Sequence, residues 1–507
     1  MKKNICTVLL LLFLCICLAS CAASFDRGNS SLGYGMMDSV VDFSQIYASQ
    51  IDGSIQNNES YNEIIQNAFI STQTEPTKAF SLKVDTAAYT NILRYIKSGN
   101  VPPVDAVRTE ELLNYFDYDA AVEESPDHPF GVVTQIAASP FSEGKYMAYI
   151  RVKTAEIATD NLPPSNLTFL IDTSGSMYSY DKLPLVVKAF SLLTEHLTEN
   201  DRVSIVVYAG SAGVVLDSAR GNDKDAIIAA LNALEAGGST AGQEGIQKAY
   251  SLAKKNYIEG GNNRVILATD GDFNVGISNT QELKNFISEK RNDGIYLSCL
   301  GFGTGNLRDD MMETLSANGN GNYSYIDSLF TAQKVLIEEM GGNLFTVAND
   351  VKSQIRFNQE NVREYRLVGY ENRTMSSEEF DDDNKDAGEI GAGTDVIVLV
   401  ELKLKEGYTG GHLFDVCIRY KDPDNNASHE AVYTNRDITQ TPDKDYNFAC
   451  SVAAFCEKLR GSSYVNTTVE DIIEYANANK GDDIKGYRAG FVDMMAQYLK
   501  LDLHTAE

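Results

Sequence analysis

Three oxygen-bearing side chains follow one another closely after an apolar run. Residues 167–171 read Leu-Thr-Phe-Leu-Ile, which is typical of a buried strand, and Asp172, Ser174 and Ser176 come next at alternate positions. A helical pattern begins soon afterwards, near residue 182. We therefore expect this carboxylate and these hydroxyls in a loop at the carboxyl edge of a sheet, which is where open α/β sheets bind their ligands.

Two later segments end near the same predicted edge. Thr240 follows a Gly-Gly-Ser segment ahead of a helical pattern, and Asp270 follows the apolar strand at 265–268 in a Thr-Asp-Gly turn. With the first loop they supply two carboxylates and three hydroxyls. Such hard oxygen donors suit Mg²⁺ or Mn²⁺, which keep several waters, and do not suit zinc, because no His or Cys is nearby. A water left on the ion allows a carboxylate from a partner to take its place.

The spacing Asp172-x-Ser174-x-Ser176, followed by Thr240 and then by Asp270, resembles the metal-ion-dependent adhesion site (MIDAS) of von Willebrand factor type A (VWA) and integrin I domains. All five positions match. The resemblance implies that the serines and the threonine approach the metal, while the aspartates bind it directly or through water. Two alternatives do not involve a metal: the polar residues cap the helices that follow the strands, or the site is degenerate and no longer binds an ion. Three matching segments at strand-to-helix turns favour a metal site over both.

The resemblance extends beyond this domain. Segments 84–89 and 108–116 look like the N-terminal region of bacterial YfbK-type VWA lipoproteins, and segments 365–373 and 386–393 look like their C-terminal region. The likeness covers nearly the whole chain beyond its first 75 residues. The resemblance identifies a protein family, but it does not identify the ligand that the family binds.

Strands alternate with helices from 165 to 345, which predicts an α/β domain with a mostly parallel central sheet flanked by helices. Strand patterns with a period of two lie on both sides, in an N-terminal region (76–160) and a C-terminal region (346–505) that ends in helices. Our hypothesis is that these α+β regions form one β-sandwich-like body into which the Rossmann-like VWA domain is inserted.

The first 21 residues resemble a lipoprotein signal peptide. Lys2 and Lys3 precede an apolar stretch that is too short to span a membrane, and Leu-Ala-Ser-Cys at 18–21 resembles a lipobox. By that resemblance Cys21 becomes a lipid-modified N-terminus, which anchors the protein in the cell envelope, at the cell membrane or the outer membrane. A plain secretory signal is the alternative. Residues 22–75 are polar and aperiodic, which indicates a flexible tether.

The net charge and the cysteine content argue against a nucleic-acid-binding protein and against a disulfide scaffold. The formal net charge of −28 argues against a nucleic-acid partner, which requires clustered Lys and Arg. Beyond Cys21 only four cysteines remain, so a disulfide scaffold is not expected, and Cys450 and Cys456 are poorly spaced for a local bridge. The five histidines show no metal-ligand spacing. The run at 381–386 reads as a solvated acidic loop, since Lys385 interrupts its likeness to a calcium loop.

These patterns predict a binding protein rather than an enzyme. The function that we expect is adhesion or scaffolding, in which a divalent ion of this chain binds an Asp or Glu side chain of a protein partner. One alternative is an assembly or chaperone-like subunit in the envelope that uses the same site. A metal-dependent hydrolase is the other, but the sequence shows no nucleophile elbow and places no His beside Ser174 or Ser176.

Overall fold

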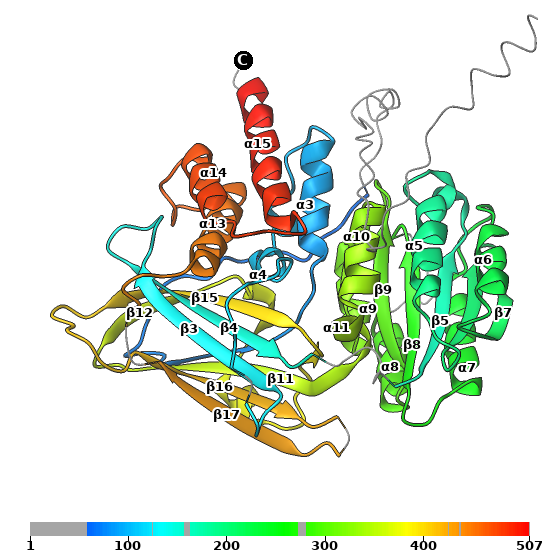
Figure 1. The fold of residues 1–507 in the computed structure, drawn as a ribbon, viewed down its shortest axis with the longest axis horizontal. Helices are drawn as coiled ribbons and strands as arrows, with labels where there is room; N and C mark the ends of the chain where they lie inside the picture. The colour runs from blue at the N-terminus through cyan, green and yellow to red at the C-terminus, as the bar shows by residue number, and fades with distance from the viewer. Residues whose placement is uncertain are drawn as a thin grey trace, which may run out of the picture. The chain divides into compact units, whose positions relative to one another are not determined.

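The computed structural model describes residues 58–123, 125–156, 163–271, 280–423, 425–435 and 438–505 (Figure 1). The predicted signal peptide with Cys21, and the predicted tether as far as residue 57, lie outside the described residues. Within the described ranges, no helix is both long and apolar enough to cross a membrane.

A six-stranded sheet forms the centre of the α/β domain, in the order β10-β9-β8-β5-β6-β7. All neighbours are parallel except β6 and β7. Alternate residues of β8 enter two hydrophobic clusters, one on each face, as a sheet covered on both sides requires. The strands are β5 (Ser165–Asp172), β6 (Arg202–Tyr208), β7 (Ala212–Arg220), β8 (Asn262–Thr269), β9 (Tyr296–Phe302) and β10 (Tyr323–Ile326).

The predicted alternation of strands and helices is confirmed. Four helices lie where the pattern placed them: α5 (Leu183–Glu195), α6 (Lys224–Asn232), α7 (Gly242–Lys255) and α8 (Thr280–Asn292). The sequence pattern did not predict β7, β10 or α9 (Asp309–Asn318), and β7 is an edge strand whose residues are mostly outside the core, so it has no continuous apolar run. The domain closes with α10 (Leu329–Gln333), a π-helical turn (Lys334–Glu338) and α11 (Met340–Leu344).

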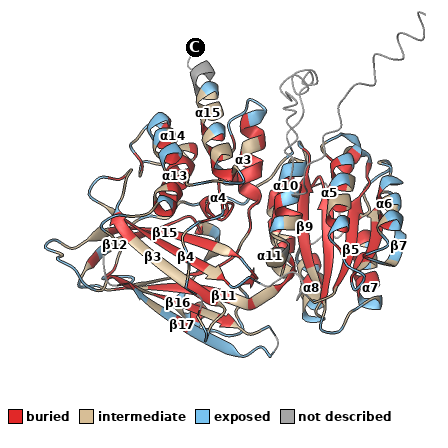
Figure 2. Cartoon of the chain, viewed as in Figure 1, coloured by how far each residue is buried: buried red, intermediate tan, exposed pale blue. Residues whose placement is uncertain are grey.

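Two further sheets pack face to face outside the α/β domain. Many residues of both sheets are buried (Figure 2). One hydrophobic cluster takes side chains from both sheets, such as Ile150 and Val398 from the first and Phe80 and Ile355 from the second. The first sheet contains β1 (Ile70–Ser71), β12 (Val362–Val368), β15 (Asp395–Leu404), β4 (Tyr146–Thr154) and β3 (Phe130–Ala138); the second contains β13 (Thr374–Met375), β2 (Thr77–Ser81), β11 (Thr346–Phe357), β16 (Phe414–Lys421) and β17 (Ser428–Asn435), with β14 (Gly388–Gly391) on β11.

Strands from both ends of the chain pair directly in each sheet. β4 is antiparallel to β15, and β2 is antiparallel to β11. Because β2 and β4 precede the α/β domain while β11 and β15 follow it, the predicted insertion into a sandwich-like body is confirmed.

The two chain crossings between sandwich and α/β domain meet at one short segment. At the end of β4, the amide of Thr154 donates to the carbonyl of Thr394 over 3.0 Å, and its hydroxyl donates to Gly391 over 2.7 Å. Just before β11, the carbonyl of Phe345 accepts from the amide of Ala392 over 2.9 Å. Residues 391–394 therefore hold both crossings together.

A layer of helices covers the other face of the first sheet. These helices share a hydrophobic cluster with sheet residues such as Met147, Tyr149 and Leu399. They come from both ends of the chain: α3 (Ala87–Lys97), α4 (Thr109–Leu113), α13 (Lys444–Leu459), α14 (Val469–Ala478) and α15 (Tyr487–Thr505). Short turns also form at η1 (Val104–Ala106), η5 (Glu371–Arg373) and α12 (Ser377–Asp381).

Residue type and spacing predict two helix caps in this layer, Asp85 ahead of α3 and a capping box of Thr467 with Glu470 ahead of α14, and both predictions are wrong. Asp85 does not cap α3, because its carboxylate instead accepts from the amide of Tyr323 over 2.9 Å and pairs with Lys83 over 2.9 Å. The capping box of α14 is formed by Thr468 and Asp471, one residue later than the predicted Thr467 and Glu470.

The predicted tether is also wrong for its last part, residues 58–75. The amides of Asn58 and Ser60 donate to the carbonyls of Gly305 and Leu307 over 3.0 and 3.1 Å, and β1 pairs with β12. Residues 58–75 therefore pack against the folded domains and are not a flexible tether.

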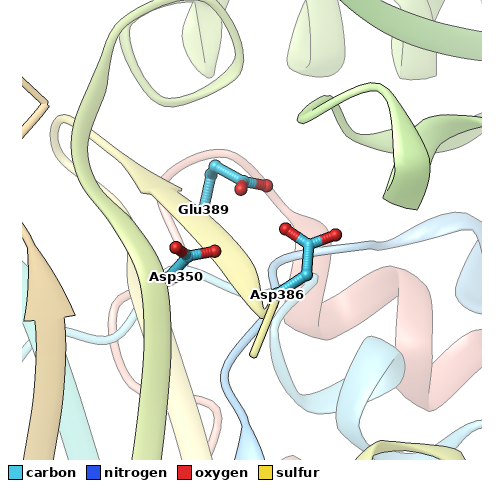
Figure 3. A group of neighbouring side chains, drawn as sticks. All are labelled: Asp350, Asp386 and Glu389. Carbon is cyan, nitrogen blue, oxygen red and sulfur yellow. The ribbon is translucent and has the colours of Figure 1, made fainter. Parts of the chain in front are cut away.

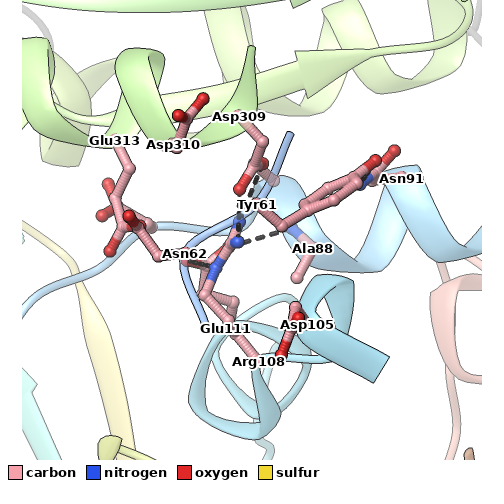
Figure 4. A network of polar contacts seen from close by, with 12 residues as sticks. Tyr61, Asn62, Ala88, Asn91, Asp105, Arg108, Glu111, Asp309, Asp310 and Glu313 are labelled. Carbon is pink, nitrogen blue, oxygen red and sulfur yellow. Dashed lines mark hydrogen bonds and ion pairs between the residues drawn. The ribbon is translucent and has the colours of Figure 1, made fainter. Parts of the chain in front are cut away.

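A buried ion-pair network joins the N-terminal region to the α/β domain (Figure 4). Arg108, just before α4, forms two hydrogen bonds with Asp309 at the start of α9, over 2.5 and 3.1 Å. Its Nε donates to Glu111 over 2.5 Å, and the other oxygen of Glu111 accepts from the amide of Ala88 over 2.9 Å. Because the three ionised side chains are at least 97% buried, this contact is shielded from solvent.

Candidate metal site at the strand ends

Asp172 is the last residue of β5, and its carboxylate is held from three directions. One oxygen accepts from the amide of Ser174 over 2.8 Å. The other accepts from the hydroxyl of Thr269, at the end of β8, over 3.0 Å and from that of Tyr208, at the end of β6, over 3.2 Å. The side chain is fully buried, so these uncharged donors fix its orientation at the carboxyl edge of the sheet.

The electrostatic setting of Asp172 favours a nearby positive charge. Burial and, to a smaller extent, the carboxylate of Asp270 raise the pKa of Asp172 to about 6, although the hydrogen bonds from Ser174 and Thr269 oppose the rise. Asp270 follows β8 and is also fully buried. Two buried carboxylates at one edge repel each other unless a cation lies between or beside them.

Ser174 and Ser176 lie in the loop after β5, and their hydroxyl oxygens are 3.0 Å apart. Ser174 is buried and Ser176 is half-buried. Met177 between this loop and α5 is completely buried in the core, which anchors the 3₁₀ turn η3 (Gly175–Tyr178) that carries Ser176. The sequence pattern correctly brings these two hydroxyls together.

The segment that carries Thr240 lies against the same loop. The amide of Gly237 donates to Thr173 over 2.8 Å, and the amide of Gly175 donates to Gly238 over 3.1 Å. Gly238 has a φ of 88°, which glycine adopts without strain. The described contacts belong to the neighbours of Thr240, which itself is half-buried. They place its backbone at the edge where Asp172 lies.

Lys182, at the start of α5, is the functional residue that sequence reasoning missed. Its Nζ donates to Oδ2 of Asp270 over 2.7 Å, and both side chains are more than 90% buried. Gly303 makes room for it, because a Cβ there would lie 2.3 Å from Cγ of Lys182. A lysine directly before the apolar start of α5 marks this position in the sequence, but that signal does not identify Asp270 as its partner.

Five residues, Asp172, Ser174, Ser176, Thr240 and Asp270, make up what we call the strand-end site. Hydrogen bonds link Asp172, Ser174 and Ser176 to one another. Asp270 reaches this edge because it follows Thr269, whose hydroxyl binds Asp172, and Thr240 reaches it through its neighbours. Their donor set is all oxygen, which suits a hard divalent ion such as Mg²⁺ or Mn²⁺. Their role as metal ligands stays a prediction, as does the lipidation of Cys21, which lies outside the described residues.

Family models match three consecutive stretches of the chain. Residues 55–148 match the model described as von Willebrand factor, residues 166–339 match von Willebrand factor type A domain, and residues 342–501 match uncharacterized protein YfbK, C-terminal.

Individual relatives differ in how much of the chain they share. A protein from Catenulispora acidiphila, the von Willebrand factor type A structure, is 16% identical with a TM-score of 0.41, over 72% of this chain and 90% of its own. Human inter-alpha-trypsin inhibitor heavy chain H4 is 31% identical over 28% of this chain and 16% of its own. Uncharacterized protein YfbK of Escherichia coli (strain K12) is 41% identical over 445 residues, which are 83% of this chain and 77% of that protein. This chain combines a VWA domain with a YfbK C-terminal region, and it therefore belongs to the YfbK family.

Proposed function

We propose that this chain is an envelope-anchored adhesion or scaffolding protein whose strand-end site uses a divalent cation to hold an Asp or Glu side chain of a protein partner. VWA domains often mediate protein–protein interactions and commonly bind a divalent metal. The proposal adds to that general property the site residues, the acidic nature of the ligand and the lipid anchor at Cys21.

The observation that carries the proposal is the fixed carboxylate of Asp172. It is fully buried at the end of the central strand, each of its oxygens accepts a hydrogen bond from an uncharged donor, and the buried carboxylate of Asp270 raises its pKa. Such an arrangement costs free energy in an apoprotein and is compensated by a bound cation. The hydroxyls of Ser174 and Ser176 lie 3.0 Å apart beside it.

The five residues of the strand-end site would hold Mg²⁺ or Mn²⁺. A bound ion supplies a positive centre for a carboxylate of the partner. The chain's own part is orientation: the strand ends fix the two aspartates, and half-buried Ser176 lies on the more accessible side. We propose binding instead of catalysis because the two carboxylates of this site are the ones committed to the ion, so neither remains as a separate general base.

Calorimetric titration of Mg²⁺ and Mn²⁺ into the chain from residue 22 onwards tests the site. We expect one ion per chain for wild type and none for Asp172→Ala, with a weaker site in Thr240→Ala. Asp225→Ala is the matched control, because Asp225 is an exposed aspartate of the same domain on α6. Binding by Asp172→Ala as tight as by wild type would overturn the assignment.

The partner chemistry has its own test. Immobilised wild-type chain should retain an envelope protein from cell extract in Mg²⁺ and release it in EDTA, whereas Asp172→Ala should not retain it. Substituting the partner's acidic residues one at a time should then abolish capture at a single Asp or Glu. Capture that survives both EDTA and Asp172→Ala would mean that another surface binds.

The anchor is tested in cells of the native host. The proposal predicts that wild type incorporates labelled palmitate and fractionates with membranes, and that Cys21→Ser does neither. Cys17→Ser serves as the control, since it removes a cysteine from the same segment without touching the proposed lipid site.

A further inference from the structure

Three carboxylates gather in the C-terminal region, in a different domain from the strand-end site. Asp350 lies on β11, Glu389 lies on β14, and Asp386 lies in the loop that leads into β14 (Figure 3). One oxygen from each comes within 4.8 Å of the oxygens of the other two. The acidic loop predicted at 381–386 is solvent-exposed at residues 381–384, as expected, but its last aspartate joins this group.

The backbone is shaped locally to bring these groups together. The pairing of β11 with β14 shifts register between Ala348 and Val351, which marks a bulge. Asp350 sits in that bulge with a φ of 50°, a left-handed conformation that is uncommon for a residue other than glycine. Its Oδ1 accepts from the amide of Ala387 over 3.2 Å, which ties the bulge to the loop carrying Asp386.

Glu389 is the member that needs a partner. It is more than nine-tenths buried, and its Oε1 has no hydrogen-bond partner in the described part of the chain. Burial and the neighbouring carboxylates of Asp386 and Asp350 together raise the pKa of Glu389 to about 8, against the opposing charges of Lys83 and Arg291. A buried, unpaired carboxylate that points into a cluster of like charge is costly unless a cation completes it.

The basic residues around the cluster do not neutralise the carboxylate of Glu389. Arg291 of α8 donates to one oxygen of Asp386 over 2.6 Å, and Lys421 donates to one oxygen of Asp350 over 2.6 Å. Lys83 lies near enough to influence Glu389, but its Nζ pairs with Asp85 over 2.9 Å. Asp386 and Asp350 thus each have one oxygen bonded to a basic side chain, whereas no basic side chain of the described residues bonds to Glu389.

We propose that Asp350, Asp386 and Glu389 bind a divalent cation, for which Ca²⁺ is the best fit. Ca²⁺ takes oxygen ligands at about 2.3–2.6 Å, so two of its ligands can lie up to about 5 Å apart, whereas Mg²⁺ at about 2.0–2.1 Å draws them closer. Ca²⁺ also accepts several carboxylates in an irregular arrangement, whereas Mg²⁺ demands near-octahedral geometry and is usually bound through one or two carboxylates. Asp386 is exposed, which lets water fill the remaining positions.

The ion would have a structural role. It would cross-link β11, β14 and the acidic loop, and through the bond from Arg291 to Asp386 it would strengthen the contact between the C-terminal region and helix α8 of the VWA domain. This second site stands apart from the proposed function, because none of its residues belongs to the strand-end site.

Calcium titration in an Asp172→Ala background isolates the second site. With the chain from residue 22 onwards, we expect one Ca²⁺ to bind and the melting temperature to rise relative to EDTA. Adding Glu389→Gln should weaken Ca²⁺ binding at least tenfold and remove the rise. Glu378→Gln, an exposed glutamate on nearby α12, should change neither.

The melting temperature in EDTA shows whether the variant is folded. Glutamine keeps the shape of Glu389 and removes its charge, so Glu389→Gln in EDTA should melt at or above the temperature of its parent. Terbium gives a further readout, because the chain has 27 tyrosines and no tryptophan, and Tyr296 lies within electrostatic reach of Glu389. Tb³⁺ luminescence sensitised by tyrosine should appear in the parent, be displaced by Ca²⁺, and be lost in Glu389→Gln.

Two results would overturn the proposal. If the Asp172→Ala parent binds neither Ca²⁺ nor Tb³⁺, a proton on Glu389 holds the cluster together instead of an ion. If Glu389→Gln binds Ca²⁺ as tightly as its parent, the ion lies elsewhere. Failure of either kind leaves the strand-end site untouched, since that site is tested with Mg²⁺ in wild type.

Discussion

Nζ of Lys182 lies 2.7 Å from Oδ2 of Asp270, and both groups are buried at the carboxyl edge of the VWA sheet. The same carboxylate belongs to the set proposed to hold a divalent ion. Lys182 therefore compensates one of the two buried aspartates whether or not an ion is bound, and Asp172 has only uncharged donors among the contacts described.

Replacing Lys182 with methionine should make folding depend on metal. Removing one member of a buried pair costs about 3–5 kcal/mol, because the other charge is left uncompensated. We expect Lys182→Met to melt well below wild type in EDTA and to gain more from Mg²⁺ than wild type does, as followed by circular dichroism. Lys224→Met, at a more exposed pair with Glu195, is the control. Equal Mg²⁺-dependent shifts in Lys182→Met and wild type would contradict this reading.

The Arg108 network predicts a strong effect at the junction of the N-terminal region and the VWA domain. Arg108→Met should lower the free energy of unfolding by about 3–5 kcal/mol, since Asp309 and Glu111 remain buried without their partner. Urea denaturation measures this loss. Adding Asp309→Asn should recover part of it. The neighbouring Arg308→Met should cost less than about 1 kcal/mol because the Arg308 side chain is 44% exposed; a similar loss in both variants would count against the network.

Glu313 gives a pH dependence with a defined sign. Burial opposes ionisation, but Arg373 and Arg108 outweigh it and lower the pKa of Glu313 to about 2. A depressed pKa contributes stability above the unfolded value near 4.5 and loses it as the pH falls towards 2. Between pH 7 and pH 4 wild type should lose about 1 kcal/mol more than Glu313→Gln, as measured by urea midpoints. A larger loss in the variant would refute the assignment.

The cysteines should be unreactive in the folded protein. All four in the described chain are free and buried, and burial raises the pKa of the Cys417 thiol to about 11 and that of Cys456 to about 12. The chain from residue 22 onwards should not react with a thiol reagent at pH 8 until guanidinium unfolds it, and should then expose four thiols. Rapid labelling of the folded chain would show that one of these side chains opens to solvent.

Sequence patterns predicted the site better than its surroundings. Local spacing predicts that Asp172, Ser174 and Ser176 lie in one loop. The rule that parallel strands end at one edge predicts that Asp270 lies near them, so the positions of these residues could be predicted without a structure. Lys182 could not, because nothing in its own segment says that it will reach Asp270, 88 residues away. The spacing of residues in the sequence predicts at which edge of the sheet a residue lies, but it does not predict the direction in which a long side chain such as that of Lys182 points.

Long-range partners explain the errors in the fold. Asp85 stands where an N-cap is expected, yet it binds the amide of Tyr323, 238 residues further on. Residues 58–75 look like a polar tether because many of their contacts are hydrogen bonds of the backbone and of polar side chains, such as those from Ser60 to Leu307 and from Asn62 to Glu313, which leave no apolar pattern. The alternation of buried strands and helices was predictable because each element carries its own periodicity.

The junction at residues 391–394 also bears on how the chain folds as it is synthesised. β4 leaves the ribosome long before its partner β15, since Val152 pairs with Val396, and β2 waits as long for β11. Contacts so distant in sequence are slow to form when the intervening chain is loose, because closing a long loop costs entropy. An inserted domain that folds first shortens that loop by bringing Thr154 and Phe345 to one place. The folded VWA domain would then hold the two ends of the loop together while the sandwich forms, and defects inside it would delay the pairing of β2 with β11 and of β4 with β15.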